Sequence, residues 1–428
     1  MRHSLLALLV AATASAQLPA IRPLGPIVAT SSEAFQGVPS VRALSDGRVF
    51  ASDPVRRRLV LLDSMLAQPQ VSLAGSNAPA TAFPARGGTL FPWRGDTTLL
   101  LDAAGASFTM LDSRGVVARV ISVPRASDAG ILSSSGTITS GYGMPMLDST
   151  GTHLVYRTYA NPTSYNTRTF VMNWPDSAPI VSVNFDTRKA DTIAFMKIPV
   201  PAPSINTTDI DGTRRSIVMS KPFELGDDWT MLPDGTIAII RWRDYHVDWV
   251  TQDHRHESSP KTAWNWVRMS DDDKAKLVDS LKSRNGRADS LQNRFMAQIN
   301  GPQFKFVGET MVVTPGEVPD YPPPFIQRAT RVDPEGRIWV LERGKYAQPS
   351  PGLVYDIIDR TGQIVDRVQA PPNAAVIGFG PRGAVYLSVA PANAALANSI
   401  PAIIPPTMGA SAPSNPCKLA KAILSPKQ

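Results

Sequence analysis

Short apolar segments recur along the chain, and each follows a polar turn that contains glycine. In each case a short approach segment precedes the turn and a run of mostly apolar residues follows it, as in LSDGRVFAS, LPDGTIAIIR and DPEGRIWVLE. Two antiparallel strands joined by a tight turn have this pattern. The repeated unit is therefore predicted to be a β-hairpin. The turn glycines are Gly47, Gly95, Gly151, Gly235, Gly336 and Gly383.

The spacing of these glycines favours a larger repeat. Gly95 follows Gly47 by 48 residues, Gly151 follows Gly95 by 56, and Gly383 follows Gly336 by 47. These intervals are close to the roughly 40–50 residues of one four-stranded propeller blade. The two longer intervals, on either side of Gly235, are predicted to carry insertions.

A second pattern follows each hairpin and supplies the remaining strands. Apolar segments that end in a polar turn occur at 58–64, 107–115, 246–253 and 353–362. We interpret these as third strands, with fourth strands at 116–123 (VVARVISV) and 363–370 (QIVDRVQA). Several strands, such as 99–101 and 237–240, are apolar without alternation, which indicates that both of their faces are covered. Sheets stacked around an axis would cover both faces.

The phrase DGRVFASD followed by RLVLLDS, with its repeats, resembles the NHL-type repeat of six-bladed β-propellers, particularly exported bacterial propellers without an assigned activity. The resemblance covers roughly residues 27–388 and rests on repetition, not on a catalytic motif. It implies an all-β fold, a six-bladed β-propeller of four-stranded antiparallel blades over residues 17–390. Such propellers close by pairing an N-terminal strand with the last blade, and GPIVATS at 25–31 is placed to be that strand.

Both ends of the chain have a distinctive composition. Residues 1–16 combine a basic start, an apolar core and small residues before Gln17, which predicts a secretory signal peptide and export to the periplasm or the extracellular space. No later segment is apolar enough to predict a transmembrane helix. Residues 391–428 are rich in Ala, Pro and Ser and are expected to be a disordered tail, which leaves the third strand of the last blade unassigned. Cys417 is the only cysteine, so an intramolecular disulfide is impossible.

A small helical insertion is predicted at about 268–300. Ser270 can cap a helix whose first turn holds three aspartates at 271–273, and a second helical stretch follows at 288–299. Two helices are therefore expected on one side of the propeller. Their apolar residues at helical spacing are Leu277, Val278 and Leu281 in the first helix and Leu291, Phe295 and Ile299 in the second.

The charge balance limits the classes of partner. The chain has 43 Lys and Arg against 36 Asp and Glu, a formal net charge of +7. The basic residues are scattered and not striped, so nucleic acid is not expected as a ligand. An excess of positive charge suits anionic cell-wall polymers or lipid surfaces, and it also serves solubility.

Charged residues end most of the second strands. In this family the second strand is expected to end near the mouth of the axial funnel, where converging charges would bind a polar ligand or an ion. The alternative is that each residue only caps its own turn. The positions are Asp53, Asp102, Arg157, Arg241 and Glu342, with Val389 as the uncharged exception.

Metal binding rests on two sets of residues. Some six-bladed propellers are hydrolases, such as gluconolactonases and paraoxonases, which hold calcium at the axis. Asp53, Asp102 and Glu342 are the candidate oxygens here, but the ligand set of those hydrolases does not align with this sequence residue by residue, which weakens the enzyme hypothesis. His254 and His256 would lie on one face of a strand and could bind zinc or copper, although no third ligand is evident. The segment TTDIDGTRR at 207–215 lacks the closing glutamate of a calcium loop and is interpreted as a turn.

Function stays open at this point between two classes. The preferred hypothesis is an exported binding or interaction scaffold for a protein, a peptide or a cell-envelope component. The alternative is a metal-dependent hydrolase such as a lactonase, with a divalent cation such as calcium as cofactor. The sequence contains no G-x-S-x-G, P-loop or H-E-x-x-H motif, so whether the protein is an enzyme is undecided. Tryptophans at 229, 242, 249, 264 and 266 are expected in the core between blades, with a sugar- or protein-stacking role as the alternative.

Overall fold

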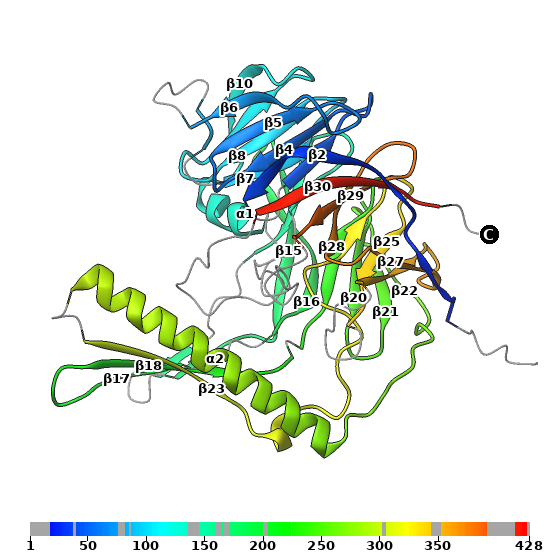
Figure 1. Cartoon of the computed structure of the whole chain (residues 1–428). Coiled ribbons are helices and arrows are strands. Elements are labelled where there is room, and N and C mark those ends of the chain that lie inside the picture. Colours follow the sequence, from blue (N-terminus) through cyan, green and yellow to red (C-terminus); the bar gives the residue numbers. More distant parts are fainter. Residues whose placement is uncertain are drawn as a thin grey trace, which may run out of the picture.

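The computed structural model describes residues 18–36, 40–75, 82–84, 87–135, 145–158, 164–166, 171–199, 204–223, 225–301, 305–343, 352–391 and 416–425. Strands dominate this part of the chain (Figure 1). The predicted signal peptide lies outside the described residues. The helices are α1 (Ala129–Ser135) and α2 (Asp271–Asn300), with single turns η1 (Ala126–Asp128) and η2 (Pro315–Glu317).

The sheet nearest the N-terminus shows how the repeated phrase folds. Strands β3 (Ser40–Ala43), β4 (Val49–Asp53), β5 (Arg58–Leu62) and β6 (Gln70–Ala74) pair in this order, all antiparallel. Gly47 lies in the turn between β3 and β4 with φ of 93°, a conformation that glycine adopts at little cost. Every residue of β4 is buried, because both faces of the sheet are covered. The predicted hairpin and its two following strands are confirmed in this sheet.

The same order recurs along the chain, and each predicted turn glycine lies between the first and second strand of a sheet. We name each sheet after its first strand. The sheets are β7 (Gly87–Pro92), β8 (Thr98–Asp102), β9 (Ser107–Leu111) and β10 (Val117–Ser122); β11 (Met146–Leu147), β12 (His153–Arg157), β15 (Ser177–Asn184) and β16 (Ala190–Lys197); β19 (Asp228–Met231), β20 (Ile237–Arg241), β21 (His246–Val250) and β22 (His256–Ser258); and β24 (Arg331–Val332), β25 (Ile338–Leu341), β26 (Val354–Ile358) and β27 (Ile364–Gln369). A separate hairpin, β13 (Ser164–Asn166) and β14 (Val171–Asn173), interrupts the connection from β12 to β15.

Apolar clusters join each sheet to the next, and the series closes on itself. Each cluster combines buried side chains of two neighbouring sheets, so the sheets form a ring, which is the arrangement of a β-propeller. The first strands lie innermost, since β3 contacts the first strands β7 and β28 on its two sides. Representative pairs are Phe50 with Leu100, Leu99 with Leu154, Ile180 with Ile239, Val247 with Ile338, Trp339 with Val385, and Ile377 with Val60.

The ring is closed by strands from both ends of the chain. The last sheet has the order β28 (Ala374–Phe379), β29 (Ala384–Val389), β30 (Pro416–Ile423) and β2 (Ile27–Gln36). The predicted pairing of the N-terminal strand with the last blade is therefore found. The expectation of a disordered tail over 391–428 is wrong for β30, which supplies the missing third strand. Cys417 and Leu419 of β30 are buried in the cluster that joins this sheet to the β3 sheet.

The helical insertion differs from the prediction in its helix count. A single helix, α2, runs from Asp271 to Asn300, and Ser270 caps it in a capping box with Asp273, as expected from the sequence. The helix continues past Gly286 because its second half is held by the strand β23 (Phe306–Val312), which contacts α2 and pairs with β18 (Arg214–Ser220). β17 (Ser204–Thr208) completes this small sheet.

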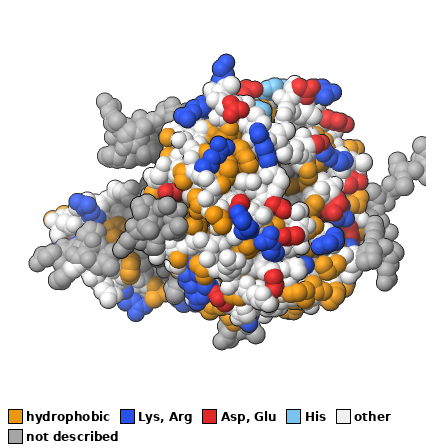
Figure 2. Space-filling model, turned by 90° about the horizontal axis from the view of Figure 1, so that it is seen from above, with side chains coloured by type: hydrophobic (Ala, Val, Ile, Leu, Met, Phe, Trp, Pro, Cys, Tyr) orange, Lys and Arg blue, Asp and Glu red, His pale blue; other side chains and the backbone are white. Residues whose placement is uncertain are grey.

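We call α2 and the β17–β18–β23 sheet the arm, and it projects away from the ring (Figure 1). Its base is an apolar cluster that contains Phe223, Met269, Val278 and Val313. In contrast to the predicted stripe of the second helix, Leu291 and Phe295 are 61% and 48% exposed. No helix in the described ranges is long and apolar enough to cross a membrane. Figure 2 shows basic and acidic side chains interspersed over one face of the molecule, as the scattered charge of the sequence predicts.

Candidate functional site

The charged residues predicted at the axial mouth share one rim of the ring. Asp53, Asp102, Arg157 and Arg241 are the last residues of the second strands, and Glu342 directly follows β25. We call this the insertion rim, because the connections that carry the arm leave from it. The opposite edge is the turn rim. The second strand stands one strand away from the innermost strand, so these residues are set back from the axis.

Asp53 and Asp102 bind backbone amides close to them. The Asp53 carboxylate accepts hydrogen bonds from the amides of Gln36 and Arg56, both at 3.1 Å, and is buried. Gln36 ends β2, so Asp53 also fixes the closing strand. The Asp102 carboxylate accepts the amides of Ala104 and Gly105, both at 3.1 Å. Both residues therefore cap turns, which was the structural alternative for them.

Arg241 and Glu342 lie in ion pairs with residues of their own sheets. The Arg241 guanidinium donates to Asp227 and to Asp248, each at 2.6 Å. The Glu342 carboxylate accepts from Arg367 at 2.6 Å. Arg157 is buried, with 5% of its surface exposed. The five predicted residues thus occupy one rim, but Asp53, Asp102, Arg241 and Glu342 each bind different partners and do not converge on a shared centre.

A buried polar network near Glu342 was not predicted from the sequence. Arg367 bridges Glu342 and Asp356, with its Nε 3.2 Å from Asp356 Oδ1, and Tyr245 donates its hydroxyl to Asp356 at 2.8 Å. Burial, reinforced by the negative charge of Glu342, raises the pKa of Asp356 to about 7. The Asp356 side chain has no exposed surface, so it cannot reach a ligand in this conformation. Its role is to join strands β26 and β27 to the β20–β21 turn.

A second buried pair lies at the innermost strands. Asp228, the first residue of β19, accepts the amide of Thr330 at 3.2 Å and its hydroxyl at 2.6 Å. Burial raises the pKa of Asp228 and lowers the pKa of the neighbouring Arg331. These residues are closer to the axis than any of the predicted five. The sequence signal was a charged residue at the start of a first strand, Asp228 in DDWT and Arg331 in TRVD.

The histidine pair is divided between two elements. His254 lies in the β21–β22 turn at the turn rim, and its Nε2 is 2.9 Å from Asp191 of β16. His256 begins β22 and is exposed. The shared strand face assumed for a zinc or copper site is therefore not formed. Within the described ranges, no three His, Cys, Asp or Glu side chains lie close enough together to hold a metal ion.

Two of the five tryptophans are buried in the core between sheets, as preferred from the sequence, and the other three are partly buried against it. Trp229 and Trp249 are 2% and 7% exposed. Trp242, Trp264 and Trp266 pack against the cluster that joins the β19 and β24 sheets. Trp264 meets Tyr245 edge to face with ring centroids 5.4 Å apart, and Tyr245 is the residue that donates its hydroxyl to Asp356.

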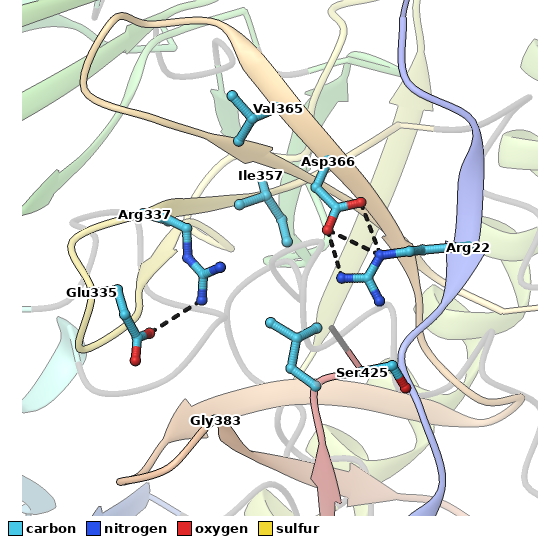
Figure 3. A pocket seen from close by; sticks show the side chains of 9 residues that line it. Arg22, Glu335, Arg337, Ile357, Val365, Asp366, Gly383 and Ser425 are labelled. Atoms are coloured by element: carbon cyan, nitrogen blue, oxygen red, sulfur yellow. Dashed lines mark hydrogen bonds and ion pairs between the residues drawn. The ribbon is translucent and has the colours of Figure 1, made fainter. Parts of the chain in front are cut away.

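A cavity of about 390 Å³ lies at the turn rim between the β24 and β28 sheets (Figure 3). Arg22 of β1 (Ile21–Pro23) pairs with Asp366 through its Nε at 3.0 Å and its Nη2 at 2.6 Å. Arg337 donates to Glu335 at 3.1 Å. None of the residues predicted at the axial mouth lines this cavity. The lining residues are Arg22, Glu335, Arg337, Ile357, Val365, Asp366, Gly383, Leu424 and Ser425.

The chain matches no protein-family model and no curated protein sequence. It is similar in structure to regucalcin from Agrobacterium tumefaciens, described as a calcium-binding protein, with 11% identity over 95% of this chain and 98% of that chain and a TM-score of 0.40. It is also similar to a gluconolactonase from Xanthomonas campestris, with 10% identity, 94% and 99% coverage and a TM-score of 0.38.

Virginiamycin B lyase from Staphylococcus aureus is a further similar structure, with 10% identity, coverage of 82% of this chain and 77% of that chain, and a TM-score of 0.30. These structures are β-propellers. With identities this low, the similarity concerns the fold and assigns no residue of this chain a role.

Proposed function

We propose that this protein is an exported, six-bladed, NHL-type β-propeller that acts as a binding or interaction scaffold, with its ligand at the axial mouth on the insertion rim. The ligand classes that we consider are a protein, a peptide and a cell-envelope component. The blade count follows if each sheet named above is one blade and the arm sheet and the β13–β14 hairpin are insertions.

The observation that carries this proposal is the placement of the long connections. On the turn rim, connections within the described chain are short, and the longest spans residues 63–69 between β5 and β6. On the insertion rim, short connections such as 54–57 alternate with long ones, which span 123–145, 158–176, 198–227, 259–330 and 390–415. In repeat proteins, insertions gathered on one face often mark the binding face. The ring then acts as a rigid support for this face.

The test of this proposal is hydrogen exchange on the mature protein with purified cell-envelope fragments and with periplasmic proteins of the host that makes it. We expect added ligand to slow exchange at the insertion rim, at segments such as 54–57 and 242–245. The turn rim, at segments such as 44–48 and 333–337, is the internal control. Protection confined to the turn rim would contradict the proposal.

Export has a separate test. Cleavage after Ala16 predicts that mass spectrometry of the protein from the host finds Gln17 as the first residue, in the periplasmic or the extracellular fraction. A chain that retains residues 1–16 in the cytoplasmic fraction would contradict export and leave the binding face untouched.

A calcium-dependent hydrolase of the lactonase type is the alternative. The candidate oxygens do not fit a calcium site as they stand, because Asp53 and Asp102 cap turns and Glu342 pairs with Arg367. Calcium needs about six to eight oxygen ligands around one point. We therefore derive no metal-dependent step. Elemental analysis of the purified protein, together with an assay of lactone hydrolysis before and after chelation, distinguishes the two functions.

A further inference from the structure

The sheet of the arm has two edges that differ in how they are protected. The strand order β17–β18–β23 leaves β17 and β23 at the edges. An edge strand presents a row of unpaired N–H and C=O groups, and natural proteins usually cover or charge such an edge. The arm also projects away from the ring on the insertion rim, so its edges are not covered by neighbouring blades (Figure 1).

Side chains of α2 cover the β23 edge. The Asp289 carboxylate accepts the Thr310 amide at 2.6 Å and its hydroxyl at 2.8 Å. Asn293 accepts the Gly308 amide at 2.8 Å and donates to the Gly308 carbonyl at 3.0 Å. The amide and carbonyl of Gly308 and the amide of Thr310, in the middle of this edge, are therefore occupied.

The β17 edge has no such cover among the described residues. The amide of Asp209 donates to Thr213 in the turn, so the residue pairs that exchange hydrogen bonds with β18 are 207 with 215 and 205 with 217. The backbone groups of Ser204, Asn206 and Thr208 consequently point outward. The strand, SINTT, carries no charge and no proline, and its register with β18 has no bulge.

Exposed apolar side chains lie on one face of the arm sheet. Gly308 and Thr310 bind α2, so Met311 of β23 faces the other side of the sheet, and the register places Ile205 and Ile217 on that side as well. Ile205 and Met311 are 56% and 46% exposed. An added strand would place every second side chain on this apolar face.

We propose that β17 accepts an extended segment of a partner polypeptide as a fourth strand of the arm sheet. The inference rests on the proposed scaffold function and names a peptide as its ligand at the arm. A row of backbone donors and acceptors is complementary to another extended backbone. A five-residue edge is too small for a stable dimer of this chain, which needs about 1,200 Å² of buried surface. Because an added strand would place every second side chain on the apolar face of the arm sheet, the partner segment is expected to carry apolar residues at alternate positions.

The test uses a labelled peptide with the sequence of β18, RRSIVMS, because β18 already pairs antiparallel with β17. Two further versions of the peptide are N-methylated at alternate residues. In one version the methyl groups block the amides along one edge of the extended peptide, and in the other version they block the amides along the opposite edge. We expect the unmodified peptide and one methylated version to bind the mature protein, and the other version to bind at least about tenfold more weakly. Equal binding by both methylated versions, or no binding up to about 1 mM, would overturn the proposal.

The variant Asn206→Pro removes an outward amide and leaves the pairing with β18 in place. We expect peptide affinity to fall about tenfold without a change in thermal midpoint, and Asn206→Ala, which keeps the amide, to bind normally. If Asn206→Pro binds as well as the wild type, the edge is not the site. Sedimentation is measured in parallel, and a dimer that Asn206→Pro dissociates would assign the edge to a second copy of this chain and overturn the peptide proposal. If the peptide does not bind but added ligand still slows hydrogen exchange at the rim segments 54–57 and 242–245, the proposal for β17 is wrong and the scaffold function is still supported.

Discussion

The carboxylate of Asp228 accepts both the backbone amide and the hydroxyl of Thr330, at 3.2 and 2.6 Å, and so ties the innermost strand of the β19 sheet to the start of β24. Both residues are buried, with 2% and 3% of their surface exposed. Neighbouring sheets are otherwise held mainly by apolar contacts, which are not directional. This pair gives the sheet interface a fixed register at the insertion rim.

Replacing Asp228 with alanine is expected to lower the free energy of unfolding by about 3 kcal/mol, because buried donors lose their acceptor. Asp228→Asn keeps one acceptor oxygen and should lose less. Urea denaturation measures both variants. Asp46→Ala, at an exposed turn where Asp46 pairs with Arg48, is the control and should change stability little. Equal losses for the alanine and asparagine variants would show that the hydrogen bonds are not the cause.

The sheet order could be predicted from the sequence because turn chemistry is local. Gly47 and Gly336 need a positive φ in a short turn, and the apolar strands around them require cover on both faces. The pair Asp228 and Thr330 could not be predicted in this way, since 102 residues separate them along the chain. β30 was missed for another reason. Its alternation of buried Cys417 and Leu419 is short and lies in a segment rich in alanine and proline.

The sequence predicted the position of the candidate site residues on one rim, but not their hydrogen-bond partners. The ends of second strands follow from the repeat, so the common rim of Asp102 and Arg241 could be expected. Whether a carboxylate points to a shared centre or to its own turn depends on backbone geometry within a few residues. The Asp102 carboxylate accepts the amides of Ala104 and Gly105 in its own turn and does not point to a shared centre.

Asp356 is expected to make stability depend on pH. The folded protein holds its proton up to about pH 7, whereas the unfolded chain releases it near pH 4, so the folded state binds more protons in this interval. The free energy of unfolding should therefore fall as pH rises from about 4 to 7. Chemical denaturation at several pH values measures this slope.

Two variants isolate this effect. Asp356→Asn cannot titrate, so the stability difference between this variant and the wild type should change steadily over the same pH interval. Glu342→Gln removes the nearby negative charge and should shift the wild-type transition to lower pH. A stability difference between Asp356→Asn and the wild type that is the same at every pH would refute the raised pKa of Asp356.

The closing strand β30 makes a third prediction. Leu419 has no exposed surface and lies in the cluster that joins the last sheet to the β3 sheet. Leu419→Ala should cost about 2–5 kcal/mol, the usual range for a buried leucine. Lys418→Ala, at the exposed neighbouring position, is the matched control. If the two variants have the same urea midpoint, β30 does not close the ring in solution.

Variants of Asp53 and Asp102 distinguish a role in turn capping from a role in metal binding. Asp53 is buried and holds the amide of Gln36 in the closing strand, so Asp53→Ala should cost about 2 kcal/mol. Asp102→Ala should cost less, because its turn is open enough for water to replace the carboxylate. Neither variant should change the divalent metal content, measured by elemental analysis beside urea denaturation. Because Asp53 and Asp102 lie in different sheets and bind different amides, the two losses should add in the double variant. A metal that is present in the wild type and lost in either variant would instead make these carboxylates ligands, and would favour the hydrolase over the scaffold.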